Sequence, residues 1–203
     1  MKRIINRIIK RFTKHVPNAE SADPFAELEA KGLKIADSSK KRMHSPWGID
    51  RMFPWLIEIG EECIISTNVV ILSHDASPAL TNGITKMGRV RIGDHVFIGQ
   101  GTTVLCGVTI GDNVIIGANS LVSRDVPSNS VFAGNPARFV CTFDEYRKKR
   151  ETEKENVPFL EHDWIYWSSK ASPEEQDRIR DLLSETGICY IKSNYEPVGG
   201  SSK

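Results

Sequence analysis

The stretch that decides the fold runs from residue 92 to residue 122 and reads I-G-D-H-V-F-I-G-Q-G-T-T-V-L-C-G-V-T-I-G-D-N-V-I-I-G-A-N-S-L-V. A branched aliphatic residue returns at every sixth position: Ile92, Ile98, Val104, Ile110, Ile116 and Val122. The next position is usually glycine, and the position four residues later is small or β-branched. Short strands joined by tight corners need this pattern, because both side-chain columns point inward and glycine fits the strained corner.

Three such units make one triangular coil of about 18 residues, and successive coils stack at the strand spacing of about 4.8 Å. The pattern continues upstream through Ile59, Ile65 and Ile71. The step from Ile71 to Ile92 is not a multiple of six, so the repeat is interrupted there. We therefore expect residues 73–89, which contain one proline and two glycines, to form a loop extruded from a corner. Loops held on a rigid scaffold often carry the chemistry of a protein.

Helix signals lie on both sides of the repeat. Asp23-Pro24 and Gly32 bracket a short helix, and Ser172-Pro173-Glu174-Glu175 is a capping box for a helix that ends at Gly187. The charged residues 143–156 form either a solvated helix or a linker. We divide the chain into an N-terminal helical segment (1–32), the repeat domain (33–140) and a C-terminal helical extension (141–203).

Charge and cysteine usage exclude several classes of protein. The chain has 203 residues, and 27 Lys and Arg against 26 Asp and Glu leave a net charge of +1. Without a strong basic field, no nucleic-acid partner is expected. The four cysteines form no C-x-x-C pair, which argues against a zinc knuckle and a secreted disulfide scaffold. No apolar stretch is long enough to cross a bilayer. We expect a cytoplasmic protein.

Five motifs carry a family resemblance: W-L-I-E-I-G-E-E from Trp55, I-L-S-H-D from Ile71, I-G-D-N-V-I-I-G-A from Ile110, S-R-D-V-P from Ser123, and the closing A-G-N-P-A-R that ends at Arg138. Together they resemble the hexapeptide-repeat O-acetyltransferases, in particular the maltose and galactoside type and the capsule-polysaccharide type. The resemblance covers about residues 55 to 140. It implies an all-β core formed by a left-handed parallel β-helix, a homotrimer with active sites between subunits, acetyl-CoA as cosubstrate, and no metal.

The resemblance also implies the reacting group. His74, at the base of the extruded loop, matches the family's catalytic histidine, which takes the proton from the acceptor hydroxyl. Asn68 and Asp75 are candidates to face the acceptor. The alternative for Asp75 is an Asx turn that shapes the loop.

Coenzyme A offers an extended pantetheine arm and a phosphorylated nucleotide, which favour exposed backbone amides and basic side chains respectively. By resemblance, the arm is lined by Gln100, Ala118 and Ser123, and the nucleotide end lies near Arg124 and Arg138. A solvated surface charge is the alternative for either arginine.

The other histidines of the chain bear on whether it belongs to a different enzyme class. His95 occupies the place in its hexad that Asn113 occupies one coil later, so we interpret it as a turn residue. The γ-type carbonic anhydrases share this fold and bind zinc through three histidines, two of them spaced H-x-x-x-x-H. The five histidines of this chain include no such pair, which argues against that activity and against a metal.

Two apolar surfaces of the chain need partners. Phe97 and Ile115 lie one coil apart on an outward column, to be covered by a neighbouring subunit or by the C-terminal helices. Residues 1–15 place isoleucines on one helical arc and basic residues opposite. Such a helix either docks on its own trimer or binds anionic lipid at the inner face of the membrane.

These observations predict an acetyl-CoA-dependent O-acetyltransferase that modifies a hydroxyl of a carbohydrate, such as a capsule, exopolysaccharide or lipopolysaccharide sugar or its precursor. His74 acts as the general base in a ternary complex. Two alternatives remain open: N-acetylation of a nucleotide-linked amino sugar or an antibiotic, and a catalytically idle β-helix scaffold.

Overall fold

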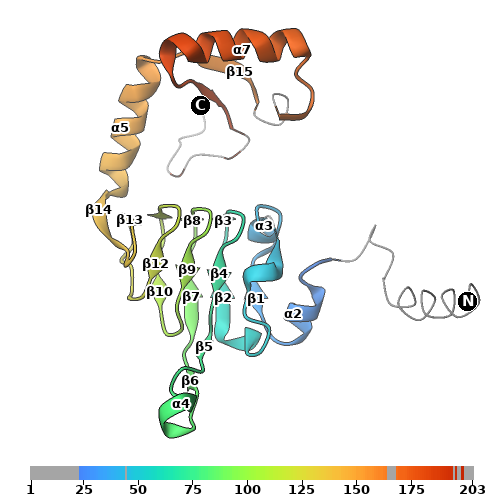
Figure 1. Cartoon of the computed structure of the whole chain (residues 1–203), viewed down its shortest axis with the longest axis vertical. Helices are drawn as coiled ribbons and strands as arrows, with labels where there is room; N and C mark the ends of the chain where they lie inside the picture. Colours follow the sequence, from blue (N-terminus) through green and yellow to red (C-terminus); the bar gives the residue numbers. More distant parts are fainter. Residues whose placement is uncertain (1–22, 44, 164–167, 194, 196–197, 199–203) are drawn as a thin grey trace, which may run out of the picture.

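A three-sided parallel β-coil forms the body of the chain, in a computed structural model that describes residues 23–43, 45–163, 168–193, 195 and 198 (Figure 1). Sheet A contains β1 (Lys34–Ile35), β2 (Ile57–Ile59), β7 (Val90–Ile92) and β10 (Thr109–Ile110). Sheet B contains β3 (Ile64–Ile65), β8 (Phe97–Ile98), β11 (Val114–Ile116), β13 (Ser130–Ala133) and β14 (Arg138–Thr142). Sheet C contains β4 (Val70–Ile71), β9 (Thr103–Val104) and β12 (Leu121–Val122). The chain turns from A to B, from B to C and from C to A, which defines three edges.

The strand register confirms the six-residue pattern. Aliphatic residues one coil apart pair in parallel on all three sheets: Ile92 with Ile110, Ile98 with Ile116, and Val104 with Val122. The aliphatic and small columns are both buried, as expected. The two polar members of the small column satisfy their hydroxyls locally, because Thr102 and Ser120 both donate to the carbonyl oxygen of Gly117.

Both ends of the coil are covered. At the first coil, α2 (Ala26–Ala30) and its flanks bury Phe25, Leu28 and Leu33 in the core, and α3 (Asp37–Lys40) and the short 3₁₀ helices η2 (Pro46–Gly48) and η3 (Pro54–Leu56) follow. At the other end, β14 runs antiparallel to β13, and the rings of Phe132 and Phe139 meet edge to face at 5.8 Å. Covered ends keep the outermost strands from pairing with other chains.

The extruded loop is present where the register predicts it. Ile71 pairs with Val104, which lies farther along the sequence than one coil, so the loop is an insertion between two stacked coils. Within it, β5 (His74–Asp75) pairs antiparallel with β6 (Lys86–Met87), and α4 (Ala79–Asn82) forms the tip. The amide of Gly88 donates to the carbonyl of Ser73 at 2.9 Å and closes the base. We call residues 73–89 the arm, which projects away from the coil (Figure 1).

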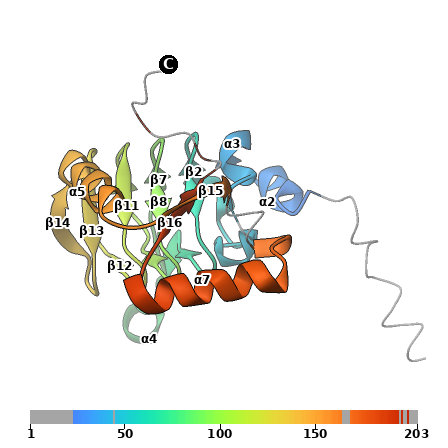
Figure 2. The same ribbon diagram turned by 90° about the horizontal axis from the view of Figure 1, so that it is seen from above.

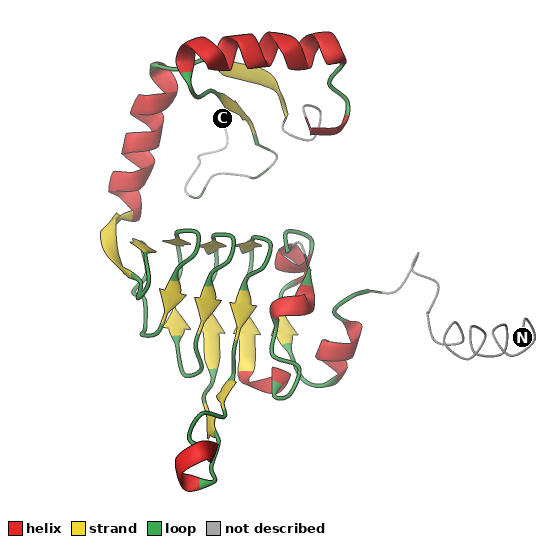
Figure 3. Cartoon of the chain, in the orientation of Figure 1, coloured by secondary structure: helices red, strands yellow, loops and turns green. Residues whose placement is uncertain are grey.

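The C-terminal extension contains more than the expected helices. Helices α5 (Phe143–Glu155) and α7 (Pro173–Thr186) are both present, and Ser172 and Glu175 form the predicted capping box. In addition, β15 (Phe159–Asp163) and β16 (Tyr190–Lys192) form a parallel pair beside α7 (Figures 2 and 3). Their pairing spans the whole of α7, and no local sequence pattern signals a contact over that distance.

Several parts of the sequence interpretation fall outside the described residues, above all the expected amphipathic helix at residues 1–15. In the part of the chain that is described, no helix combines the length and the apolar character that a bilayer crossing requires.

Candidate active site

His74 lies at the base of the arm, on the C–A edge of the coil, and its imidazole is held by a buried carboxylate. Nδ1 of His74 is hydrogen-bonded to Oδ2 of Asp50. The Asp50 side chain is only 3% exposed, whereas that of His74 is 23% exposed. The ring of Phe53 contacts the imidazole edge to face, with centroids 5.3 Å apart. The imidazole is therefore fixed on two sides while part of it remains open to solvent.

Asp50 is ionised in this environment. Burial by itself would raise the pKa of its carboxyl, but hydrogen bonds from the Ser73 hydroxyl, the Met52 amide, His74 and the Ser73 amide outweigh burial and lower the pKa to about 2. The distances are 2.7 Å from the Ser73 hydroxyl, 3.0 Å from its amide and 2.9 Å from the Met52 amide. The carboxylate thus carries a full negative charge against Nδ1 of His74 at neutral pH.

This arrangement selects one tautomer of His74. An ionised carboxylate can only accept hydrogen bonds, so Nδ1 must carry the hydrogen. Nε2 then presents its lone pair and can take a proton, and the carboxylate stabilises the imidazolium that forms. The Asp50–His74 pair therefore has the geometry of a general base with its positioning partner.

Sequence reasoning did not find Asp50. Ile49 bridges to Ile71, which places Asp50 one coil before the segment that leads into His74. The separation of the two isoleucines is not a multiple of six, so counting hexads does not reach this position. The only sequence signal is an aspartate directly after a buried aliphatic residue at the start of the coil.

The two acceptor candidates lie in different places. Asp75 follows His74 on the C–A edge, and its Oδ1 accepts a hydrogen bond from the Ser77 amide at 2.8 Å, which is the Asx turn given above as the alternative role. Asn68 lies on the B–C edge in the left-handed conformation, with φ of 57°. Asn119 has the same conformation at the equivalent corner two coils on, so turn geometry alone accounts for an asparagine at this position.

His95 is a turn residue, as its place in the hexad predicts. Its φ is 55°, and Asn113 has a φ of 54° at the equivalent corner one coil later. The backbone amide of His95 donates a hydrogen bond to the backbone carbonyl of Glu61 at 2.8 Å. It stands on the A–B edge, whereas His74 stands on the C–A edge.

The structure brings three of the five candidate cofactor residues together. Ser123, Arg124 and Arg138 line one cavity of about 350 Å³ on the C–A edge. The closing motif makes this possible, because the Ala137 amide donates to the Leu121 carbonyl at 2.8 Å and so places Arg138 beside β12. His74 is on the same edge two coils away, a distance of about 10 Å at the usual strand spacing. An anionic ligand in this cavity could extend toward the imidazole.

The other two cofactor candidates, Gln100 and Ala118, lie on the B–C edge. Their corners stack closely, because a Cβ on Gly99 would come within 2.5 Å of the Ala118 nitrogen. Both residues are exposed. In a single chain they are separated from His74 and Ser123 by sheet C.

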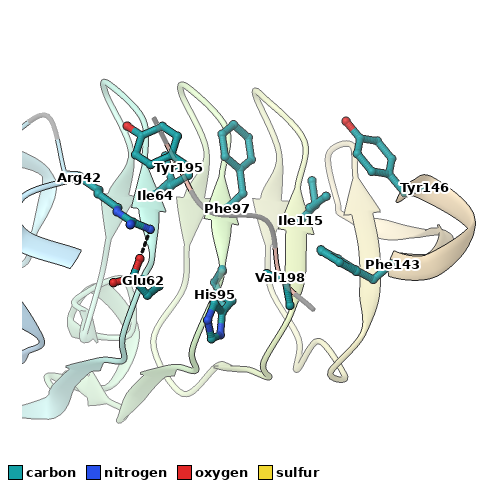
Figure 4. Close-up of a pocket in the computed structure, with 11 residues that line it drawn as sticks. Arg42, Glu62, Ile64, His95, Phe97, Ile115, Phe143, Tyr146, Tyr195 and Val198 are labelled. Carbon is teal, nitrogen blue, oxygen red and sulfur yellow. Dashed lines mark ion pairs between the residues drawn. The ribbon is translucent and has the colours of Figure 1, made fainter. Parts of the chain in front are cut away.

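A second cavity, of about 300 Å³, lies on the outer face of sheet B and is separate from His74 (Figure 4). The outward column of Phe97 and Ile115 forms its floor, and residues of α5 and the C-terminal tail complete it. Arg42 pairs with Glu62 and lies over the ring of Tyr195 at 5.0 Å. The chain's own C-terminal extension therefore covers part of this column, which is one of the two covers that the sequence left open.

Comparison with known proteins identifies the repeat. Residues 89–124 match the bacterial transferase hexapeptide (six repeats), and residues 57–73 match the hexapeptide repeat of succinyl-transferase. These two stretches of the coil are therefore similar to transferase hexapeptide repeats. The resemblance to the hexapeptide-repeat acyltransferases is thereby confirmed.

Curated relatives of the hexapeptide coil are named as acetyltransferases. The chain is 40% identical to the putative acetyltransferase YvoF of Bacillus subtilis (strain 168) over 52% of this chain and 59% of that protein. It is 37% identical to a probable macrolide acetyltransferase of Lysinibacillus sphaericus over 53% of this chain and 54% of that protein. The chain therefore spans little more than half the length of these relatives. A solved maltose O-acetyltransferase from Clostridium difficile 630 aligns at 24% identity over 67% of this chain and 83% of that chain, with a TM-score of 0.46.

No group of three or more His, Cys, Asp or Glu side chains suited to a metal ion occurs among the residues that the structure describes. The reactive groups that the site does present are an imidazole and a carboxylate.

Proposed function

We propose that this protein is an acetyl-CoA-dependent O-acetyltransferase that modifies a hydroxyl of a carbohydrate. The observation that carries the proposal is the buried, ionised Asp50 on Nδ1 of His74, because it leaves Nε2 as a proton acceptor at the base of the arm. The match of the coil to transferase hexapeptide repeats, and the names of its relatives, support acetyl transfer as the reaction.

The reaction follows from this geometry in two steps. Nε2 of His74 takes the proton of the acceptor hydroxyl as its oxygen attacks the thioester carbonyl, which gives a tetrahedral intermediate. The intermediate then collapses, the carbon–sulfur bond breaks, and the imidazolium returns the proton to the leaving thiolate. The products are an acetyl ester and free coenzyme A. Asp50 stays ionised throughout and holds the ring in place.

The site requires more than one copy of the chain in this proposal. Gln100 and Ala118 lie on the B–C edge, whereas His74 and the Ser123 cavity lie on the C–A edge. In a homotrimer of left-handed β-helices, the B–C edge of one copy would face the C–A edge of the next, and the pantetheine arm would run between them. Asn68 would then face the acceptor from the neighbouring copy. A monomeric mass in analytical ultracentrifugation at assay concentration would contradict this assembly.

Arg124 and Arg138 are assigned to the nucleotide end of coenzyme A. A charge contact to phosphate is equally strong in the ground state and the transition state, so its loss weakens binding without slowing the chemical step. We expect Arg124→Ala and Arg138→Ala each to raise the KM for acetyl-CoA by about 10-fold while kcat stays within about twofold. Steady-state kinetics with acetyl-CoA measure both constants.

A matched control separates this contact from a general loss of charge. Arg180 is an exposed arginine on α7, paired with Asp177. We expect Arg180→Ala to leave the KM for acetyl-CoA unchanged. If Arg124→Ala or Arg138→Ala lowers kcat without raising the KM for acetyl-CoA, that arginine does not bind the nucleotide end of coenzyme A.

The rival functions are distinguished by an acceptor panel. Thioester cleavage is measured with sugars, amino sugars, a macrolide and buffer alone, and the acetylated product is identified by mass spectrometry. The proposal requires a sugar-dependent release of thiol and an ester product. An amide product would support the N-acetyltransferase alternative, and cleavage that no acceptor stimulates would support the idle scaffold.

The remaining assignments concern the ends of the chain. We propose the division into residues 1–32, 33–140 and 141–203, with the hexapeptide unit as the transferase domain. We further propose a cytoplasmic protein whose residues 1–15 contact anionic lipid at the inner face of the membrane, because the sequence separates basic from apolar residues at helical spacing. Liposome flotation of the full chain and of a form lacking residues 1–15 tests this contact, and equal partitioning would exclude it.

A further inference from the structure

Exposed apolar side chains occur on the two segments that adjoin His74. Met52 and Trp55, on the segment that links sheet C to sheet A in the first coil, are 61% and 52% exposed. Met87, on β6 of the arm, is 55% exposed. The exposure of large apolar side chains to water is unfavourable. A group of them next to a reactive residue therefore indicates a site that binds a ligand or another protein surface.

Direct contacts connect this group to the imidazole. The Phe53 ring meets His74 at 5.3 Å and Trp55 at 5.4 Å, edge to face in both cases. On the arm, Met87 lies directly opposite His74 in the antiparallel pair β5–β6. Side chains that lie opposite each other in such a pair project from the same face of the hairpin. Met87 and the Phe53–Trp55 pair therefore both adjoin His74, Met87 from the arm and the aromatic pair from the first coil.

The same segment also positions the base. The Met52 amide donates to Asp50 at 2.9 Å, and Asp50 holds Nδ1 of His74. The exposed side chain of Met52 is thus attached to the backbone that holds Asp50, and Trp55 follows three residues later on the same segment.

We propose that Met52, Trp55 and Met87 form an acceptor platform on which the C–H face of a pyranose ring lies, with one ring hydroxyl directed at Nε2 of His74. A pyranose has an apolar face of axial C–H bonds and a polar rim of hydroxyls. An indole offers a flat apolar surface for the face, while the Asp50–His74 pair serves the rim. This inference rests on the proposed function, and it assigns the acceptor class to particular side chains.

The platform predicts a selective effect on acceptor binding. With methyl glucoside, galactoside and mannoside as acceptors at saturating acetyl-CoA, we expect Trp55→Ala to raise the acceptor KM about 10-fold or more. The KM for acetyl-CoA stays unchanged. Trp55→Phe, which keeps a ring at this position, restores most of the affinity. Acetylation of sorbitol, an open-chain polyol that has hydroxyls but no ring face, changes by less than about twofold in Trp55→Ala.

Ile188→Ala is the matched control, because Ile188 is an apolar residue of nearly the same exposure, 53%, in the C-terminal extension. We expect it to leave every kinetic constant unchanged. An acceptor KM in Trp55→Ala equal to that of the wild type overturns the platform, as does an equal loss in Trp55→Phe. A lower sedimentation mass for Trp55→Ala also overturns it, since these side chains would then form a contact between copies of the chain.

The outcome for the platform is separable from the outcome for the proposed function. If the wild-type protein acetylates none of the methyl pyranosides, the proposed carbohydrate activity fails. If the wild type acetylates them and Trp55→Ala does so with the same acceptor KM, only the platform fails. Transfer to a macrolide but to no pyranoside would assign the exposed apolar group to a different acceptor class and overturn the inference.

Discussion

His74→Ala is expected to lower kcat by about 10²- to 10⁴-fold, the usual loss when a general base is removed. The fold should tolerate the change, because Asp50 keeps three other donors: the hydroxyl and amide of Ser73 and the amide of Met52. The affinity for coenzyme A should also persist, since the cavity of Arg124 and Arg138 lies two coils away. Single-turnover kinetics, thermal unfolding and calorimetric titration with coenzyme A measure the three quantities separately.

The pH dependence gives a second readout of the same variant. A protonated imidazole cannot accept the hydroxyl proton, so kcat/KM of the wild type should fall on the acid side. That decline should be absent from the residual activity of His74→Ala. His95→Ala is the control, because His95 is a turn residue on another edge, and its kcat should change by less than about threefold. Turnover near the wild-type level in His74→Ala would show that another group deprotonates the acceptor.

The coil could be predicted from the sequence because the residues of each hexad determine the corner that they form. An aliphatic residue, a glycine and a small residue repeat within every hexad, and the register of the stacked coils follows from them without any long-range information. The arm could be predicted for the same reason, since the step from Ile71 to Ile92 breaks the count. Where the hexad is intact, local chemistry determines the structure.

The first coil could not be predicted in this way. Between Ile35 and Ile57 the chain uses α3, η2 and η3 in place of regular hexads, and Ile49 reaches its partner Ile71 over a span that is not a multiple of six. Asp50, Phe53 and Trp55 all lie in this irregular stretch. Asp50, Phe53 and Trp55 therefore come from the part of the domain that lacks the six-residue repeat, so the repeat cannot place them beside His74.

The candidate cofactor residues also divide into those that the hexad count places and one that it does not. Ser123 and Arg124 follow β12 directly, so the hexad count places them on the C–A edge with His74. Arg138 joins them only because the chain reverses after β13 and the Ala137 amide pairs with Leu121. The resemblance to the family's closing motif predicted that Arg138 lies near Arg124, whereas the repeat alone does not reach Arg138. Gln100 and Ala118 belong to the B–C edge, and the same hexad count places them there, because they follow Ile98 and Ile116 of sheet B.

Asp50→Asn should affect both catalysis and stability, because Asp50 acts through His74 and is itself buried. Asp50 accepts four hydrogen bonds, and an amide in its place would turn donor hydrogens toward at least one of the same donors. The amide also removes the charge that fixes the hydrogen on Nδ1. We expect kcat to fall about 10²-fold or more, with the KM for acetyl-CoA nearly unchanged. The change in kcat without a change in cofactor binding marks a positioning role.

The stability effect of Asp50→Asn has a defined pH dependence. The folded state lowers the pKa of Asp50 from its ordinary value of 3.8 to about 2, so folding favours the ionised form. The associated stabilisation, about 2 kcal/mol for a shift of this size, is fully present above about pH 4 and is lost as the pH falls toward 2. Denaturant unfolding at pH 7 should therefore give free energies of unfolding for wild type and Asp50→Asn that differ by about this amount, and the difference should narrow at pH 3 and below.

Asp112→Asn is the control, since Asp112 also accepts a backbone hydrogen bond, from Asp94 at 2.9 Å, but is exposed on the A–B edge. A gap between wild type and Asp50→Asn that stays constant from pH 7 to pH 2 would mean that the carboxyl is not ionised against His74, and His74 would then lack the partner that makes Nε2 a base.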